Sequence, residues 1–285
     1  MTPTYDQARD AAREKAAQAD YGSPFRFELT RLVPRLIRRY CPAPADALDV
    51  GCGSGRYALF FIEADVTGTY TGVDISEERW SDLPLPAEFP GRREQLDAHE
   101  LGTMNRQFDF VISLTAYEHF ADDHRVARGM AAVMKPQSHA LIAVPAHFSY
   151  PLYGEHGYRR YSAGAVRRLA KQAGLTVVEL RRVGGLCGWL FHFGWFFPAK
   201  AMQLAGKAAL YGAHGMNKKK ARARFPRLTR TLDEMGLHHL RWAWGRTLHR
   251  ACLQAAAKCD RFLPLLEVGY LAVLRKPSPG NARAG

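Results

Sequence analysis

The segment ALDVGCGSGRYALFF, residues 47–61, constrains the fold of this chain more than any other part of the sequence. A short apolar strand ends at Val50, a turn with three glycines follows, and a helix begins near Arg56. Glycines allow a sharp turn and a close approach of the backbone to a ligand. Arg56 stands where a dinucleotide-binding turn has its third glycine, and the segment lacks the lysine of a P-loop. The segment therefore predicts a strand, turn and helix that bind another kind of ligand.

Short apolar runs alternate with helical patterns along most of the chain. Strands are predicted over residues 47–50, 70–74, 94–98, 108–113, 139–145, 176–184 and 269–277, and helices over 5–19, 27–40, 125–135 and 162–175. This alternation predicts an α/β fold with a seven-stranded, mostly parallel sheet covered by helices on both faces. A helical insertion is expected between the last two strands.

The same pattern divides the chain into five parts. They are an N-terminal helical cap (1–40), a core (41–184), an insertion (185–265), the final core strand (266–277) and a disordered tail (278–285). The insertion is the least ordinary part, because most folds of this kind have a short turn there.

Two acidic residues and a strand end follow the glycine turn in a fixed order. Asp74 ends the second predicted strand, about twenty residues after the glycines, where a carboxylate accepts hydrogen bonds from both ribose hydroxyls of a nucleoside. Asp97, near the end of the third strand, is placed to bond an adenine amino group, and FDFVISLTAYEHF closes the fourth strand. Each feature alone is common, but their order favours a nucleoside-containing ligand.

This series resembles the class I methyltransferases that depend on S-adenosylmethionine (SAM), and within them the branch that modifies small molecules such as quinones, lipids and glycans. The resemblance covers residues 40–184 and the final strand. It implies a Rossmann-like fold, SAM as the methyl donor and S-adenosylhomocysteine as the product. The implied cofactor contacts are Asp49, Gly51, Cys52, Gly53 and Gly55 for the methionine part, Asp74 for the ribose, Ile75, Asp97 and Ala98 for the adenine, and Ser113 and Leu114 for the amino-acid end.

Candidate catalytic residues follow the fourth and fifth strands, because ligands of open α/β sheets sit outside the carboxyl ends of the strands. Methyl transfer requires alignment in a site shielded from water, and a hydroxyl acceptor also requires a base. The candidates are Glu118, His119, His147, His156 and Tyr161. Glu118 and His119 have an alternative interpretation as residues that open a helix, and the other two histidines as solvated loop residues. Arg159, beside Tyr161, could hold an acidic substrate or lie in solvent.

Departures from other methyltransferase branches narrow the reaction. Enzymes that methylate amino groups of DNA bases resemble one another in an Asn/Asp-Pro-Pro-aromatic run after the fourth strand, where this chain has SLTAY. Catechol-type enzymes carry a magnesium-binding aspartate at the end of that strand, where this chain has Ser113. The differences disfavour nucleobase methylation and predict a site without metal.

The insertion opens with an uncharged aromatic run and continues with a basic stretch. Residues 183–199 contain no Lys, Arg, Asp or Glu, but the run is shorter than the roughly 20 apolar residues that span a bilayer. Residues 214–250 hold ten Lys or Arg against two acids, which supplies +8 of the formal net charge of +13. This combination suits a segment that lies on an anionic membrane surface. A helical lid over the core is the alternative interpretation, and RNA binding is a third.

The expected location is the cytoplasm, with the enzyme peripheral on the inner face of the membrane. The N-terminus has no apolar secretory signal, and five scattered cysteines form no CxxC pair. The expected activity is SAM-dependent O-methylation of a lipid-linked glycan, a lipid or a quinone, with nucleic acid disfavoured as a partner. The alternatives are a cytosolic small-metabolite methyltransferase with a helical lid and a non-catalytic SAM-binding regulatory protein.

Overall fold

The computed structural model contains one seven-stranded sheet at its centre, in the order β3-β2-β1-β4-β5-β7-β6. It describes residues 4–19, 23–76, 85–153, 157–214, 220, 223–233 and 242–278. The strands are β1 (Ala45–Val50), β2 (Gly68–Asp74), β3 (Gly91–Gln95), β4 (Phe108–Leu114), β5 (Met134–Pro145), β6 (Thr176–Val183) and β7 (Gly269–Arg275). β7 runs antiparallel to both of its neighbours, and the pairs from β3 to β5 are parallel. The predicted mostly parallel sheet is confirmed.

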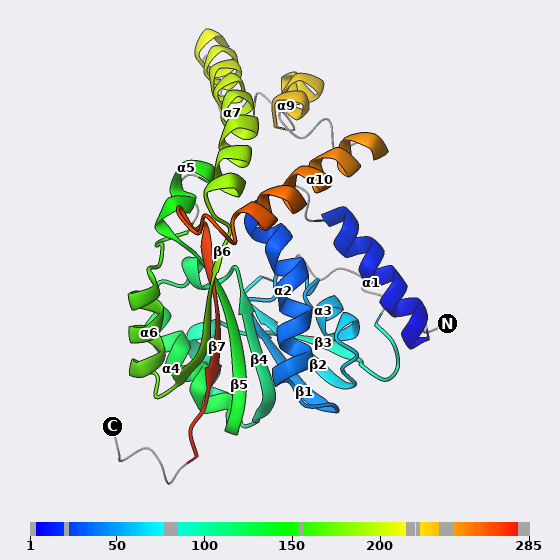
Figure 1. The fold of residues 1–285 in the computed structure, drawn as a ribbon, viewed down its shortest axis with the longest axis vertical. Coiled ribbons are helices and arrows are strands. Elements are labelled where there is room, and N and C mark those ends of the chain that lie inside the picture. Colours follow the sequence, from blue (N-terminus) through cyan, green and yellow to red (C-terminus); the bar gives the residue numbers. More distant parts are fainter. Residues whose placement is uncertain are drawn as a thin grey trace.

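Helices cover both faces of this sheet, as Figure 1 shows. One face carries α1 (Tyr5–Ala19), α2 (Pro24–Tyr40) and α3 (Ala58–Glu63), and the other carries α4 (Asp123–Val133) and α6 (Ala163–Gln172). The core is accordingly split into two apolar clusters, one on each face. Central strands such as β4 are buried on both faces, which explains their nearly continuous apolar sequences.

The insertion between β6 and β7 is helical. It contains α7 (Leu186–His214), α9 (Pro226–Asp233) and α10 (Ala243–Cys259). α7 rises from the end of β6 and extends away from the sheet, while α10 packs against α7 and α2 (Figure 1). Among the helices of the described residues, none is both long and apolar enough to cross a membrane.

Several predicted boundaries shift in the structure. The third strand is β3, so residues 96–98 of the predicted strand lie beyond its end, and Asp97 instead caps the short 3-10 helix η2 (Ala98–Thr103). β5 begins at Met134 rather than at residue 139, because Met134 already pairs with Phe108 of β4. α6 ends at Gln172, before the end of the predicted helix over 162–175, and Gly174 follows it with φ +72°. Residues 279–285 of the predicted disordered tail lie outside the described residues.

The topology places a crevice at the carboxyl end of β1. The strand that follows β1 in sequence, β2, pairs on one side of it, and β4 pairs on the other. At such a switch point the connections leave in opposite directions, which opens a space for a ligand outside the strand ends. The glycine turn, Gly51–Gly55, lies there.

Candidate functional site

The glycine turn after β1 uses glycine because its backbone is left-handed. Gly51, Gly53 and Gly55 have φ values of +73°, +53° and +73°, which residues with a Cβ rarely adopt. The backbone N–H groups of Gly51 and Cys52 donate to the carbonyl of Val73 at 2.9 and 3.0 Å. These two bonds fix the turn to the end of β2. The thiol of Cys52 is buried, and burial raises its pKa, so it stays protonated.

Asp49 lies directly before this turn and is fully buried. Its Oδ2 accepts a hydrogen bond of 2.6 Å from the hydroxyl of Tyr70, whereas its Oδ1 accepts none from any described residue. Burial raises the pKa of Asp49 to about 7, the Tyr70 hydrogen bond opposes the rise, and the charge of Asp74 adds to it. A buried carboxyl with a spare acceptor atom therefore faces the glycine turn.

Asp74 connects the ends of β2 and β1. Its Oδ2 accepts from the backbone N–H of Gly53 at 2.8 Å, and its Oδ1 accepts from that of Ser76 at 3.0 Å. The next residue, Ile75, is 67% exposed. The structure thus brings Asp74, the predicted ribose contact, to the glycine turn, with Ile75 beside it in the chain.

Asp97 stands at the N-terminus of η2, after β3. Its Oδ1 accepts from the backbone N–H of His99 at 2.9 Å and lies 2.6 Å from Nδ1 of the same residue. These hydrogen bonds lower the pKa of Asp97. Ala98 beside it is buried. Capping is the role that the structure gives to Asp97, and its contact with adenine stays a prediction.

The end of β4 packs directly against the end of β1. Ser113 donates from its hydroxyl to the carbonyl of Val50 at 2.8 Å, and Leu114 is buried. Thr115, which follows, has φ +55° and shares a 3.0 Å hydrogen bond with the hydroxyl of Tyr57. Tyr57, Tyr70 and Thr115 are site residues that were not predicted from the sequence. Only Tyr70 had a detectable signal, because it is an apolar residue of the predicted strand over 70–74, and the structure buries it.

Glu118 is a buried acid in the segment that follows β4. It lies in the 3-10 helix η3 (Tyr117–His119), two residues after Ala116, which packs against Gly51. Burial raises the pKa of Glu118 to about 7, and the positive charges of Arg160 and Arg26 limit the rise. Its Oε2 is buried and accepts no hydrogen bond from the described part of the chain. The backbone N–H of Tyr158 donates to the carbonyl of Glu118 at 2.6 Å, so the 157–161 loop lies over it.

Arg159 and Tyr161 fasten this loop to the protein. Arg159 donates to the carbonyls of Phe120 and Ala121 at 3.0 and 2.8 Å and pairs with Asp123 at 2.8 Å. The hydroxyl of Tyr161 donates to Asp123 at 2.8 Å. The chain's own oxygens therefore bind the guanidinium of Arg159, which is partly exposed. The structure gives Tyr161 a positioning role, and its catalytic role stays a prediction.

The three candidate histidines differ in what the structure says of them. His119 is exposed in η3, and His147 is exposed in η4 (His147–Ser149), directly after β5. His156 lies outside the described residues. Within the described ranges, no group of three or more His, Cys, Asp or Glu residues could hold a metal ion.

We expect Gly51→Ala to destabilise the fold more than Gly53→Ala. At Gly51 a Cβ would lie 2.6 Å from the Cβ of Ala116, whereas at Gly53 it would meet no described atom within 4 Å. Both variants incur about 1–2 kcal/mol for a left-handed residue, and the clash at Gly51 adds about 1–3 kcal/mol. Thermal unfolding without ligand measures the difference, and equal melting temperatures for the two variants would contradict it.

Comparisons with known proteins bear on the family and the fold of the chain. A family model described as a methyltransferase domain matches residues 24–180, more than half of the chain. No curated protein sequence matches the chain. The solved structure of the [4+2]-cyclase SpnF superposes with a TM-score of 0.51 at 17% identity, over 97% of this chain and 98% of that one.

Two further solved structures are similar at lower TM-scores. A putative sarcosine dimethylglycine methyltransferase from Galdieria sulphuraria has a TM-score of 0.49 at 16% identity, over 88% of this chain and 85% of that one. The YcgJ protein from Bacillus subtilis also has a TM-score of 0.49 at 16% identity, over 89% of this chain and 99% of its own. At such identities the likeness concerns the fold alone.

Proposed function

Because the chain belongs to the methyltransferase-domain family of class I SAM-dependent methyltransferases, we propose that it transfers a methyl group from SAM to a hydroxyl of a lipid, a lipid-linked glycan or a quinone. The proposal that SAM is the methyl donor rests on the glycine turn and on Oδ1 of Asp49 beside it, which accepts no hydrogen bond from the described residues. The proposal that the methyl acceptor is a lipid, a lipid-linked glycan or a quinone is supported by the exposed apolar side chains of the insertion. The enzyme is expected to work in the cytoplasm, peripheral on the inner face of the membrane.

The residues at the turn fit SAM. The open space at Gly53 leaves room for a ligand next to the backbone, and Asp49 offers a buried anionic oxygen to a cationic ligand. Asp74 has one hydrogen bond on each oxygen, and a carboxylate oxygen accepts more than one, so ribose hydroxyls can be added. When bound, SAM supplies a methyl group on a positively charged sulfur.

Glu118 is the proposed base for the acceptor hydroxyl. A carboxyl with a pKa of about 7 is half ionised near neutral pH, and its ionised form accepts a proton from a hydroxyl that is losing it to form the new carbon–oxygen bond. Its Oε2 has no competing hydrogen bond from the described residues. The packing of Ala116 on Gly51 joins the segment that carries Glu118 to the glycine turn. His147 is the second candidate for this role, since it directly follows β5.

The insertion contacts the acceptor side of the core. The indole N–H of Trp189 in α7 donates to the carbonyl of Phe148 in η4 at 2.8 Å. Large apolar side chains of the insertion and of the segment after β5 are exposed, among them Phe148, Tyr150, Leu190, Phe197, Met202, Trp242, Trp244, Phe262 and Leu265. So much exposed apolar surface beside a basic stretch is typical of a membrane-binding face. This face would bring an amphipathic acceptor to the site.

The reaction is tested by incubating the protein with SAM and either a membrane lipid extract or an aqueous metabolite extract. Release of S-adenosylhomocysteine with the lipid extract, together with a lipid that has gained one CH₂ in mass, supports the proposal. Release with the aqueous extract alone favours a small-metabolite methyltransferase with a lid. Tight SAM binding without release in either extract favours a regulatory protein.

We expect the protein to float with anionic vesicles at low salt. Exchanging two exposed indoles in W242S/W244S removes apolar contact area and is expected to lower vesicle binding by more than tenfold, because each buried indole contributes on the order of 2 kcal/mol and about 1.4 kcal/mol corresponds to a factor of ten. Val178→Ser, an exposed apolar position on β6 outside the insertion, is the matched control and should bind like the wild type. Wild-type protein that stays in the aqueous fraction at low salt would refute membrane docking.

A further inference from the structure

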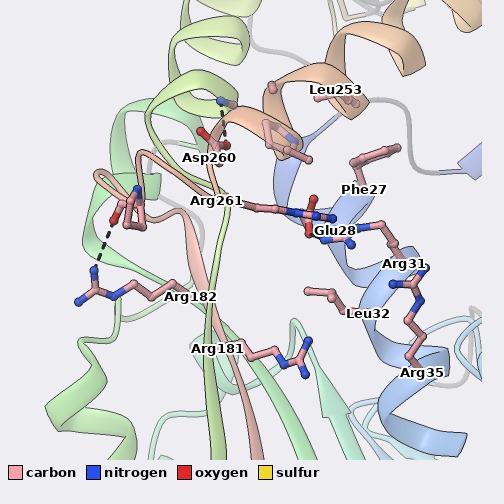
Figure 2. A pocket seen from close by; sticks show the side chains of 16 residues that line it. Phe27, Glu28, Arg31, Leu32, Arg35, Arg181, Arg182, Leu253, Asp260 and Arg261 are labelled. Atoms are coloured by element: carbon pink, nitrogen blue, oxygen red, sulfur yellow. Dashed lines mark hydrogen bonds and ion pairs between the residues drawn. The ribbon is translucent and has the colours of Figure 1, made fainter.

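A second cleft lies on the α2 face of the sheet, apart from the glycine turn. α2, the end of β6, the start of α7 and the end of α10 enclose a cavity of about 520 Å³ (Figure 2). None of the residues proposed above for SAM or the acceptor lines it. The size falls within the range of roughly 300–1,000 Å³ that holds small ligands.

Arginines dominate the charge of this cleft. Its lining includes Arg31, Arg35, Arg181, Arg182 and Arg261 against two acids, Glu28 and Asp260. In Figure 2, Arg181 and Arg261 point toward α2, where Arg31 and Arg35 lie, whereas Arg182 points away. Four guanidinium groups from three separate segments therefore border one cavity.

The two acids of the cleft are already engaged. Glu28 is buried and pairs through Oε2 with Arg31 at 2.5 Å, while its Oε1 accepts no hydrogen bond from the described residues. Asp260 accepts hydrogen bonds from the backbone N–H groups of Cys187 and Gly188 at 2.7 and 3.1 Å, where it caps the start of α7. Five arginines against two carboxylates leave the lining with a formal surplus of three positive charges.

Arg35 and Arg261 form no hydrogen bond or ion pair with any described residue. Arg181, by contrast, is bonded to Glu179 of its own strand. Positive charges gathered in a concave site with apolar walls produce a strong local potential, which repels cations and concentrates anions. Phe27, Leu32 and Leu253 supply such walls here.

We propose that this arginine cleft, defined by Arg31, Arg35, Arg181 and Arg261, binds the phosphate or diphosphate group of a small ligand. Guanidinium groups match phosphate oxygens in a bidentate geometry, and arginine is favoured over lysine where such recognition is needed. The cavity is larger than a phosphate ion, so the ligand carries a further group against the apolar wall. Because the cleft borders both α2 and α10, its ligand ties the insertion to the core. The proposal requires no assumption about the methyl acceptor.

Binding is tested with two probes, inorganic pyrophosphate in solution and phosphatidylcholine vesicles that contain phosphatidic acid. The cleft variant is R35Q/R261Q, which changes two exposed side chains without partners in the described part of the chain. The control is R167Q/R168Q, which removes the same charge from exposed positions on α6, on the opposite face of the sheet. Calorimetry measures pyrophosphate affinity, flotation measures vesicle binding, and circular dichroism verifies folding.

R35Q/R261Q is expected to weaken binding of at least one probe by about tenfold or more, while R167Q/R168Q binds like the wild type. A loss confined to pyrophosphate identifies a soluble phosphorylated ligand, and a loss confined to vesicles identifies a lipid headgroup. Equal losses in both double variants would reduce the effect to net charge and overturn the proposal. So would a wild type that binds neither probe. Because binding is measured without methyl transfer, this outcome is separate from any failure of the proposed function.

Discussion

Replacing Asp49 by Asn is expected to weaken SAM binding by about tenfold to a hundredfold and to flatten the pH dependence of stability. The first effect follows because a buried charged acceptor contributes about 1.5–3 kcal/mol to a ligand that pairs with it. The second follows from the pKa of Asp49, which burial raises from 3.8 to about 7. The folded state then binds more protons than the unfolded state between these values.

The sign of the second effect is fixed by this difference in protons. The contribution of Asp49 to the free energy of unfolding is highest below pH 4, falls as the pH rises, and levels off once Asp49 is ionised above pH 7. For a fully buried group the loss is on the order of 4 kcal/mol. Asn at this position does not titrate, so the variant lacks the part of the pH dependence of stability that Asp49 contributes. Burial also raises the pKa of Glu118, which adds to the fall in stability with pH. Glu118 is present in both the wild type and Asp49→Asn, so the difference between these two proteins isolates the contribution of Asp49.

Melting temperatures at pH 5 and pH 8 and calorimetric titration with SAM measure both effects. Asp46→Asn is the control, because Asp46 lies on the same strand at its other end, where it bonds to Thr69 and Arg106. It should leave SAM affinity unchanged. Wild-type SAM affinity in Asp49→Asn would exclude the role proposed for the spare oxygen of Asp49.

Glu118→Gln is expected to lower turnover by about a hundredfold or more while SAM affinity stays within a few-fold of the wild type. Loss of a general base has effects of this size, and the amide keeps the shape of the side chain. In the wild type, turnover should rise with pH through about 7, because the ionised carboxylate is the active form and burial raises its pKa to about 7. The variant should lose this rise.

His147→Gln and His119→Gln provide the comparison for Glu118→Gln. If Glu118 is the base, both histidine variants keep the pH profile of the wild type, and His119→Gln, an exposed neighbour in η3, also keeps its turnover. If instead His147→Gln abolishes turnover and leaves SAM affinity intact, His147 is the base. Full activity in Glu118→Gln would remove Glu118 from the reaction.

Local patterns were sufficient to predict the sheet and the position of the glycine turn. Gly51 and Asp74 could be placed because each marks a strand end, and parallel strands bring these ends to one edge. The end of β3 was less predictable, since its sequence is polar and its pairing with β2 decides where it stops. The left-handed backbone of Thr115 has no sequence signal, because the residue is not glycine.

The side-chain contacts of the site could not be predicted from the sequence for a different reason. Arg159 was interpreted as a substrate or solvent contact, but its partners at Phe120, Ala121 and Asp123 come from a distant segment. Likewise, the burial that shifts the pKa of Glu118 depends on the 157–161 loop, which folds over η3. Such contacts depend on how loops from separate strands meet, which residue spacing does not encode.

The pairing of β6 with β7 has a consequence for how such a protein can change over evolution. These strands are antiparallel neighbours, and Val183 pairs with Gly269, so the whole insertion is the loop of a hairpin. The cost of closing a loop grows only slowly with its length. An insertion at this place can therefore lengthen, shrink or be exchanged while the half of the sheet that carries Asp49 and Asp74 is undisturbed. If the insertion selects the acceptor, as proposed, acceptor preference and donor binding are open to independent selection.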